Sequence, residues 1–301
     1  MAGLTVKSDG VELRVIDRGS KNKTTLLFLH GFPDCHEVWS HQIDALSKDY
    51  RVIAFDLRGA GESTSPDSKS GYSMRHMLKD IDAVLDATVG SEAKVHLIGH
   101  DWGSIIGWSY VMDRHRSSRL LSWTSMSGPH IALAMSRLQR SLMVGSTDHR
   151  KAAIDQLAHS WYTLAMFVPG FGRGLASLKP AQVWRAIMRM GGVSADDPYL
   201  DKTATQAKAL LNNWPMYSQN LMSPEFKMPP RNCIHVPTQL IVPLDDAFVR
   251  PILFRGLERY VTNLSKVEID ANHWAQRQQP EMITSLIRDF VASFAEETAA
   301  A

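Results

Sequence analysis

Short apolar segments alternate with helical patterns along the first half of this 301-residue chain. Segments rich in β-branched and other apolar residues predict strands at 11–17, 25–30, 51–56, 94–99 and 120–128. The stretch 72–89 predicts a helix, because apolar residues recur there at helical intervals: Met74, Met77, Leu78, Ile81, Val84 and Leu85. Short apolar strands separated by helices are typical of a mostly parallel central sheet with helices on both faces.

The pattern changes after Pro129. From about residue 131 to 224 the sequence is rich in Met, Trp, Ala and Leu, and its periodicity is helical throughout. Strand patterns return at 238–244 and 266–270, and a final amphipathic helix is predicted from Pro280, since proline is favoured in a first helical turn. We therefore expect an α/β core formed by residues 1–130 and 225–301, into which residues 131–224 are inserted as a helical cap.

Composition narrows the range of partners. The chain carries 33 Lys and Arg against 31 Asp and Glu, interspersed, so nothing in it favours nucleic acid or an anionic membrane. No apolar run approaches the roughly 18 to 20 residues of a membrane span, and the N-terminus lacks the apolar block of a signal peptide. Cys35 and Cys233 show no metal-binding spacing, and we expect a reducing cytoplasm. A homodimer is left open.

The segment LIGHDWGS, residues 97–104, places an acidic residue where a sharp turn after a strand presents a reactive side chain. Gly99 and Gly103 stand two residues before and two residues after Asp101. A strained strand-to-helix turn needs this spacing, because a Cβ at either flanking position would collide with the neighbouring turn. The commoner version of the turn has serine at its centre. The pattern predicts Asp101 as a nucleophile.

Further acidic and imidazole candidates follow later predicted strands. Asp245 and Asp246 come directly after the strand at 238–244, and His273 comes shortly after the strand at 266–270. In open parallel sheets, ligands bind at the carboxyl ends of the strands, so these side chains are expected near Asp101. Their order along the chain, nucleophile, then acid, then histidine, is the order of the α/β-hydrolase fold.

Over nearly its whole length the chain resembles the epoxide hydrolases of the α/β-hydrolase fold. The resemblance lies in HGFPD (30–34), DLRGAGES (56–63), GHDWGS (99–104), DDAFV (245–249) and NHWAQRQQPE (272–281). The segment SWTSMSGPH (122–130) further resembles the hydrolase half of bacterial epoxide hydrolases fused to a short-chain dehydrogenase. The resemblance implies the α/β-hydrolase fold and a two-step hydrolysis through a covalent alkyl-enzyme ester.

An aspartate nucleophile suits an epoxide. The electrophilic carbon is sp³ and has no carbonyl group, and a carboxylate that is already ionised near neutral pH can displace the ring oxygen from behind. The resulting ester supplies the carbonyl that water then attacks. The resemblance implies Asp101 as nucleophile and His273 as general base. The family pattern of an acid, a small residue and an aromatic fits Asp246 rather than Asp245 as the acid that orients the histidine.

The resemblance also implies the groups around the reacting atoms. The backbone N–H groups of Phe32 and Trp102 would form the oxyanion hole. Because a ring-opened epoxide is a strongly basic alkoxide, the family supplies two cap tyrosines as donors, which Tyr162 and Tyr217 match. These four residues would bind the substrate, although Ser218 replaces the family's arginine after the second tyrosine. The implied reaction converts a small apolar epoxide to a vicinal diol without a metal or an organic cofactor.

Two alternatives remain. Haloalkane dehalogenases share the aspartate turn but usually carry an asparagine after the His-Gly pair, where this chain has Phe32. Fluoroacetate dehalogenases carry an arginine after the nucleophile, where this chain has Trp102. Both differences, together with the tyrosines, favour an epoxide. The second alternative is a non-catalytic ligand-binding protein, because the fold alone does not fix the function. Turnover of a generic epoxide distinguishes the two classes.

Overall fold

The computed structural model describes residues 3–165, 168, 170, 174, 177, 179–201, 203–221, 223 and 227–299. Part of the predicted cap lies outside the described residues, including positions 166, 167 and 169 of the segment that contains Tyr162. The predicted second boundary of the cap, at 224–225, lies outside them as well.

Eight strands form one sheet in the order β1-β2-β4-β3-β5-β6-β7-β8. β1 and β2 pair antiparallel with each other, and β2 pairs antiparallel with β4, whereas every pairing from β4 to β8 is parallel. The sheet is therefore mostly parallel, as the sequence predicts. The strands span Leu4–Ser8, Val11–Arg18, Thr25–Leu29, Arg51–Phe55, Val95–His100, Leu120–Met126, Thr238–Pro243 and Leu264–Ile269.

Burial explains why the central strands read as continuous apolar runs. All residues of β3, β4, β5 and β7 are buried, because helices cover both faces of the sheet there. β8 lies at the edge of the sheet and is mostly exposed. The prediction that the strand from residue 120 runs to 128 was too long. It ends at Met126, because Ser127 adopts a φ of 52° in the left-handed region and cannot continue the extended backbone.

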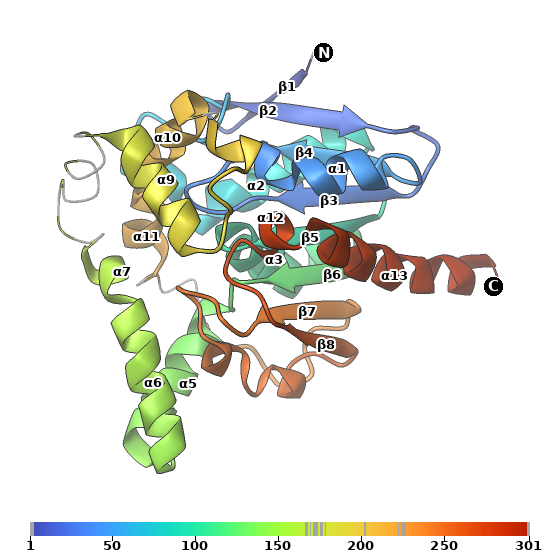
Figure 1. Cartoon of the computed structure of the whole chain (residues 1–301). Coiled ribbons are helices and arrows are strands. Elements are labelled where there is room, and N and C mark those ends of the chain that lie inside the picture. The colour runs from blue at the N-terminus through green and yellow to red at the C-terminus, as the bar shows by residue number, and fades with distance from the viewer. Residues whose placement is uncertain are drawn as a thin grey trace.

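Helices cover the sheet from both sides (Figure 1). α1 and α13 pack together on one face, and α2 and α3 pack together on the other. The apolar positions of the predicted helix at 72–89 are buried in α2, and α13 begins at Pro280 as predicted. The helices span Ser40–Leu46 (α1), Met74–Thr88 (α2), Trp102–Met112 (α3), Arg114–Ser117 (α4), Ala275–Gln278 (α12) and Pro280–Ala299 (α13), with short 3₁₀ turns at His36–Trp39, Lys69–Tyr72, Pro251–Phe254 (η4) and Leu257–Arg259 (η5).

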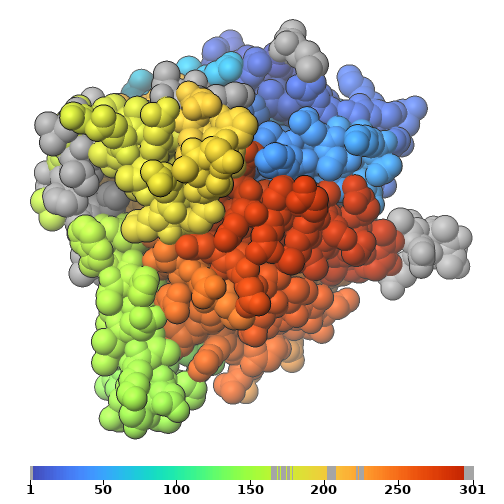
Figure 2. Space-filling model, in the orientation of Figure 1, coloured from blue at the N-terminus to red at the C-terminus, as the bar shows by residue number. Residues whose placement is uncertain are grey.

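Between β6 and β7 the described chain is helical. α9, α10 and α11 lie over the carboxyl ends of the parallel strands, whereas α5 and α6 form an arm that projects from the body of the molecule (Figures 1 and 2). No described helix is long and apolar enough to cross a membrane. The helices span Ile131–Val144 (α5), Thr147–His159 (α6), Trp161–Ala165 (α7), Pro180–Met190 (α9), Thr203–Asn212 (α10) and Pro215–Asn220 (α11), with a 3₁₀ turn at Pro198–Asp201.

Candidate active site

Asp101 occupies a tight turn between β5 and α3, with a φ of 51° and a ψ of −120°. This backbone conformation is costly for a residue with a side chain and is typical of functional sites. A Cβ at Gly99 would lie 2.6 Å from the carbonyl oxygen of Gly103, and a Cβ at Gly103 would lie 2.4 Å from that of Leu29. The two glycines therefore have the steric role that their spacing in the sequence predicts.

The Asp101 side chain does not cap the helix that follows it. Its Oδ1 atom accepts a hydrogen bond of 2.7 Å from the backbone N–H of Phe32, and the backbone N–H of Trp102 also hydrogen-bonds the carboxylate. Its Oδ2 atom lies 3.7 Å from Nε2 of His273. One carboxylate oxygen is thus held by the backbone N–H of Phe32, and the other faces the imidazole.

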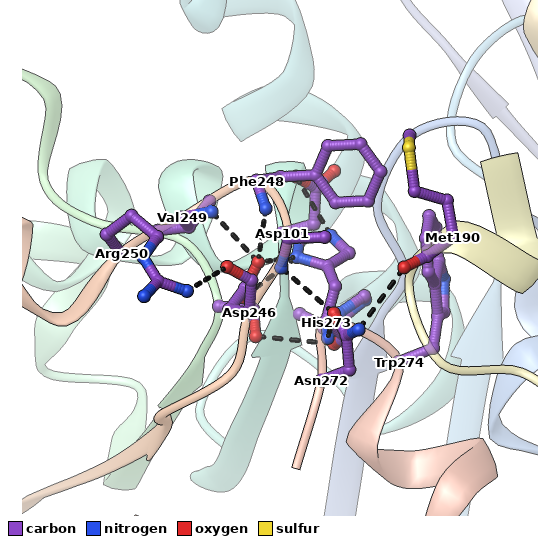
Figure 3. A network of polar contacts seen from close by, with 12 residues as sticks. Asp101, Met190, Asp246, Phe248, Val249, Arg250, Asn272, His273 and Trp274 are labelled. Atoms are coloured by element: carbon purple, nitrogen blue, oxygen red, sulfur yellow. Dashed lines mark hydrogen bonds and ion pairs between the residues drawn. The ribbon is translucent and has the colours of Figure 1, made fainter. Parts of the chain in front are cut away.

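His273 is buried against a second carboxylate, that of Asp246 (Figure 3). Its Nδ1 atom lies 3.0 and 2.9 Å from the two carboxylate oxygens of Asp246. Oδ1 of Asp246 also accepts hydrogen bonds of 2.8 Å from the backbone N–H groups of Phe248 and Val249, which fixes the carboxylate. Of the two adjacent acids, Asp245 is exposed and Asp246 faces the histidine.

Burial and neighbouring charges shift the pKa values of Asp101 and His273. Burial raises the pKa of Asp101 to about 6, although His273 and the two backbone N–H groups favour its ionised form. Burial by itself would lower the pKa of His273, but Asp246 and, to a smaller extent, Asp101 outweigh it and raise that pKa above its usual value. The site therefore stabilises a positive charge on the histidine whenever Asp101 is ionised.

The two tyrosines reach the site from separate helices, Tyr162 from α7 and Tyr217 from α11. Their hydroxyls are hydrogen-bonded to each other. The side chain of Trp102 is also hydrogen-bonded to Tyr217, and because an indole N–H only donates, the Tyr217 proton is directed to Tyr162. Burial, followed by the charge of Asp101, raises the pKa of Tyr162, so the hydroxyl stays protonated. The hydroxyl proton of Tyr162 is therefore available for a hydrogen bond to a ligand.

These groups meet in a cavity of about 340 Å³. Asp101, His273 and both tyrosines line it, and most of the remaining wall is apolar. Buried apolar walls with a few convergent polar groups are typical of small-molecule sites. The other lining side chains include Phe32, Val183, Ile187, Met190, Leu210, Trp214, Phe248 and Trp274.

Comparison with known proteins agrees with this geometry. The α/β-hydrolase fold family matches residues 24–280. The chain belongs to this family. It is 30% identical over 296 residues to a protein of Mycobacterium tuberculosis named probable oxidoreductase EphD, covering 96% of this chain and 49% of the relative. The chain therefore spans about half the length of that relative.

Other relatives of this hydrolase-fold chain are named epoxide hydrolases. Epoxide hydrolase 3 of Xenopus tropicalis is 27% identical over 299 residues, which are 96% of this chain and 77% of the relative. A crystal structure of the Bacillus megaterium epoxide hydrolase in complex with an inhibitor superposes with a TM-score of 0.74 at 25% identity. That match covers 96% of this chain and 100% of the other. The fusion to a dehydrogenase stays a prediction.

Sequence reasoning gave no role to Asn272, which joins three parts of the hydrolase fold (Figure 3). Its Oδ1 atom accepts hydrogen bonds from the backbone N–H groups of Ala247 (2.9 Å) and His273 (2.7 Å). Its Nδ2 atom donates to the carbonyl oxygen of Met190 at the end of α9 (3.2 Å). Asn272 therefore ties the acid loop, the histidine loop and an inserted helix together. Its position immediately before His273 is the feature of the sequence that could have indicated this role.

Asp34 is a second buried group without a predicted role. Its carboxylate accepts hydrogen bonds from Nε1 of Trp274 (2.8 Å) and from the hydroxyl of Tyr199 (2.9 Å). Burial raises its pKa to about 7, because these two donors compensate only part of the lost hydration. The carboxylate fixes the residue next to His273 and, through Tyr199, the inserted segment. Its place in HGFPD was the only signal in the sequence.

Proposed function

We propose that the protein is an epoxide hydrolase that converts a small apolar epoxide to a vicinal diol through a covalent ester on Asp101. The observation that carries the proposal is the unequal environment of the two Asp101 oxygens. The backbone N–H of Phe32 holds Oδ1, and Oδ2 faces His273 within an apolar cavity that Tyr162 and Tyr217 also line. The names of the relatives and their structural likeness support the same reaction.

In the first step, Asp101 attacks one carbon of the epoxide ring. The epoxide oxygen accepts hydrogen bonds from Tyr162 and Tyr217, replacing the bond between the two hydroxyls. Oδ2 of Asp101 forms a bond to one ring carbon while the bond from that same carbon to the ring oxygen breaks, and a tyrosine donates its proton to the resulting alkoxide. The product of this step is a neutral ester between Asp101 and the alcohol.

In the second step, water cleaves this ester. His273 removes a proton from water, and the hydroxide adds to the carbonyl carbon of Asp101. The negative charge develops on Oδ1, which already accepts a hydrogen bond from the N–H of Phe32. The N–H of Trp102 is the second donor of the proposed oxyanion hole. Asp246 stabilises the imidazolium. The bond from the carbonyl carbon to Oδ2 then breaks, the imidazolium of His273 donates its proton to Oδ2, and the diol leaves with that oxygen. The water oxygen stays in Asp101, whose remaining carboxyl proton passes to the tyrosinate formed in the first step, so both groups return to their starting forms.

We also propose that residues 131–224 form a cap over this site. The positions of α9, α10 and α11 over the carboxyl ends of the strands, and the presence of both tyrosines in inserted helices, support it. A cytoplasmic location is part of the proposal, on the ground that the chain has only two cysteines, Cys35 and Cys233, in 301 residues. The oligomeric state stays a prediction to be measured by light scattering.

The test is a single turnover in ¹⁸O-labelled water with enzyme in excess. The label is expected in the peptide that contains Asp101 and not in the first diol released. As a second readout, His273→Gln is expected to accumulate the ester, seen as an increase in intact mass equal to the mass of the epoxide. Label in the first diol, with no adduct on the variant, would refute the covalent mechanism.

A parallel assay separates the epoxide from a halide substrate. A terminal aryl epoxide and a bromoalkane of similar size are each incubated with the wild type and with the Tyr162→Phe/Tyr217→Phe double variant. We expect diol formation by the wild type and its loss in the double variant, because only an alkoxide needs the phenolic protons. Release of bromide without diol formation would instead assign the site to a dehalogenase.

A further inference from the structure

A second cavity, of about 150 Å³, lies outside the site that contains Asp101. It is enclosed by α5, by the segment that follows β7 with η4 and η5, and by residues 228–231. α5 packs directly against η4, and Figure 1 shows that segment beside α5. Five arginines line this arginine cavity: Arg137, Arg140, Arg231, Arg255 and Arg259.

The positive charge of the arginine cavity is poorly compensated. Within the described part of the chain, no ion pair joins any of the five arginines to a carboxylate. Burial and then the positive charge of Arg259 lower the pKa of Arg137, with smaller contributions from Arg255 and Arg140. Two acids act against this charge, Glu258 on Arg137 and Glu268 on Arg255, against five arginines. Like charges collected in one concave site favour the binding of an anion.

In the arginine cavity, hydrogen bonds hold Arg137 in place, and apolar side chains form part of the wall. The Arg137 guanidinium donates from Nε and Nη2 to the carbonyl oxygen of Arg255, at 3.0 and 2.9 Å, which holds its plane in place. Behind the cationic side chains lie buried apolar ones, among them Trp108, Phe254 and Leu257. Charged hydrogen bonds gain strength beside such a water-poor wall.

We propose that the arginine cavity binds a phosphate group, either as free phosphate or as a phosphomonoester. A phosphate dianion offsets two positive charges at once, and planar guanidinium groups bind its oxygens through paired N–H donors. The cavity has room for one tetrahedral oxyanion but not for an extended polyanion. The ligand is therefore a single phosphate group rather than nucleic acid. This binding site is separate from the hydrolytic site and goes beyond the proposed reaction.

The proposal is tested by isothermal titration of the full chain with inorganic phosphate at constant ionic strength, adjusted with chloride. The test variant is Arg140→Gln/Arg259→Gln, because both side chains are exposed and removing them leaves the bond from Arg137 to Arg255 intact. The matched control is Arg114→Gln/Arg189→Gln, which removes two exposed arginines elsewhere. Saturable binding of one phosphate is expected for the wild type and the control, with an affinity about tenfold or more weaker in the test variant.

A second arm identifies the source of the phosphate. Vesicles that contain a lipid phosphomonoester are compared with vesicles that contain a phosphodiester lipid at equal charge. Binding of inorganic phosphate that is lost in the test variant supports a free ligand, and binding confined to phosphomonoester vesicles and lost in that variant supports a lipid headgroup. Equal weakening in both double variants, or no phosphate binding by the wild type in either arm, would overturn the proposal.

Discussion

The two halves of the inserted helical segment are attached to the rest of the molecule in different ways. The second half, α9 to α11, is fixed by buried hydrogen bonds to loops around the sheet. Nε1 of Trp184 donates to the carbonyl oxygen of Pro33 at 3.0 Å, and Nδ2 of Asn213 donates to that of Arg58 at 3.0 Å. Asn220 bonds both the backbone of Met74 and that of Tyr72.

The first half, the arm of α5 and α6, has fewer such bonds. Its main buried attachment is Gln156, whose side chain donates to the carbonyl oxygen of Phe248 (2.9 Å) and accepts from the backbone N–H of Arg250 (2.6 Å). At the tip of the arm, Met143 and Val144 are 69% and 75% exposed. The arm therefore depends on contacts with the loop that carries Asp246.

This difference in attachment affects how firmly Tyr162 and Tyr217 are held. Tyr217 belongs to α11, whose neighbour Asn220 is bonded to the core, and its ring packs edge-on against Trp102 with centroids 5.0 Å apart. Tyr162 belongs to α7, which packs on the arm helix α6. One tyrosine is therefore held by the core and the other by the arm. Under the proposed reaction, we expect the epoxide oxygen to be positioned mainly by Tyr217.

Replacing Asp101, the proposed nucleophile, gives the largest expected effect on activity, because the tyrosines of both halves act on the substrate that Asp101 attacks. Asp101→Asn is expected to lower kcat/KM by a factor on the order of 10⁴ or more, because the amide cannot open the ring. At pH 7.5 the same change is expected to raise the free energy of unfolding by roughly 2–3 kcal/mol, because it removes a buried carboxylate whose pKa is about 6.

The stability gain of Asp101→Asn depends on pH, and its direction follows from the raised pKa of Asp101. A folded-state pKa above the unfolded value of 3.8 means that ionisation of Asp101 costs stability increasingly as pH rises from about 4 to 6. The stability gain of Asp101→Asn should therefore shrink as pH falls through this range, as measured by chemical denaturation. A gain independent of pH would contradict the assignment of the buried charge.

The tyrosine variants test the comparison directly. Tyr217→Phe is expected to lower kcat/KM for an epoxide on the order of 10²-fold or more, and Tyr162→Phe by less. The reason is that the tyrosine left in Tyr162→Phe is the one anchored to the core. Steady-state kinetics on both single variants and the double variant measure the difference. Equal effects, or a larger effect of Tyr162→Phe, would show that the attachment of the two halves does not decide donor strength.

A pH profile of the alkylation step distinguishes the ionisation of Asp101 from that of the two tyrosines. Asp101 attacks only when ionised, so the single-turnover rate is expected to fall about tenfold per pH unit below pH 6. Tyr162 and Tyr217 have pKa values raised above 10, so no loss is expected between pH 7 and pH 9. Rapid-quench detection of the ester gives the rates. A decline in the alkaline range would mean that a tyrosine titrates near neutrality.

The smallest effect is expected from the arm. Gln156→Leu removes the partner of the part-buried carbonyl of Phe248 and of the part-buried N–H of Arg250, which is expected to cost about 1 kcal/mol of stability and to lower activity several-fold. Val144→Gln at the exposed tip is the control and should change stability by less than about 0.5 kcal/mol. Thermal denaturation and kcat/KM measure both. A silent Gln156→Leu would show that the arm is held by other contacts.

The features that could be predicted from the sequence are those whose causes lie within one short segment of the chain. The turn at Asp101 follows from the sterics of Gly99 and Gly103, and the parallel sheet follows from short strands that alternate with helices. Contacts between distant segments have no such signal. Asp34 and Trp274 are 240 positions apart, and the arginine cavity collects side chains from three separate segments. Only the folded arrangement brings these groups together.

The contact of Oδ1 of Asp101 with the backbone N–H of Phe32 also decides which inhibitors can succeed. The carboxylate of Asp101 occupies this donor before any compound arrives. Anionic tetrahedral mimics should therefore be excluded, and effective inhibitors should be neutral molecules that engage the phenolic hydroxyls instead.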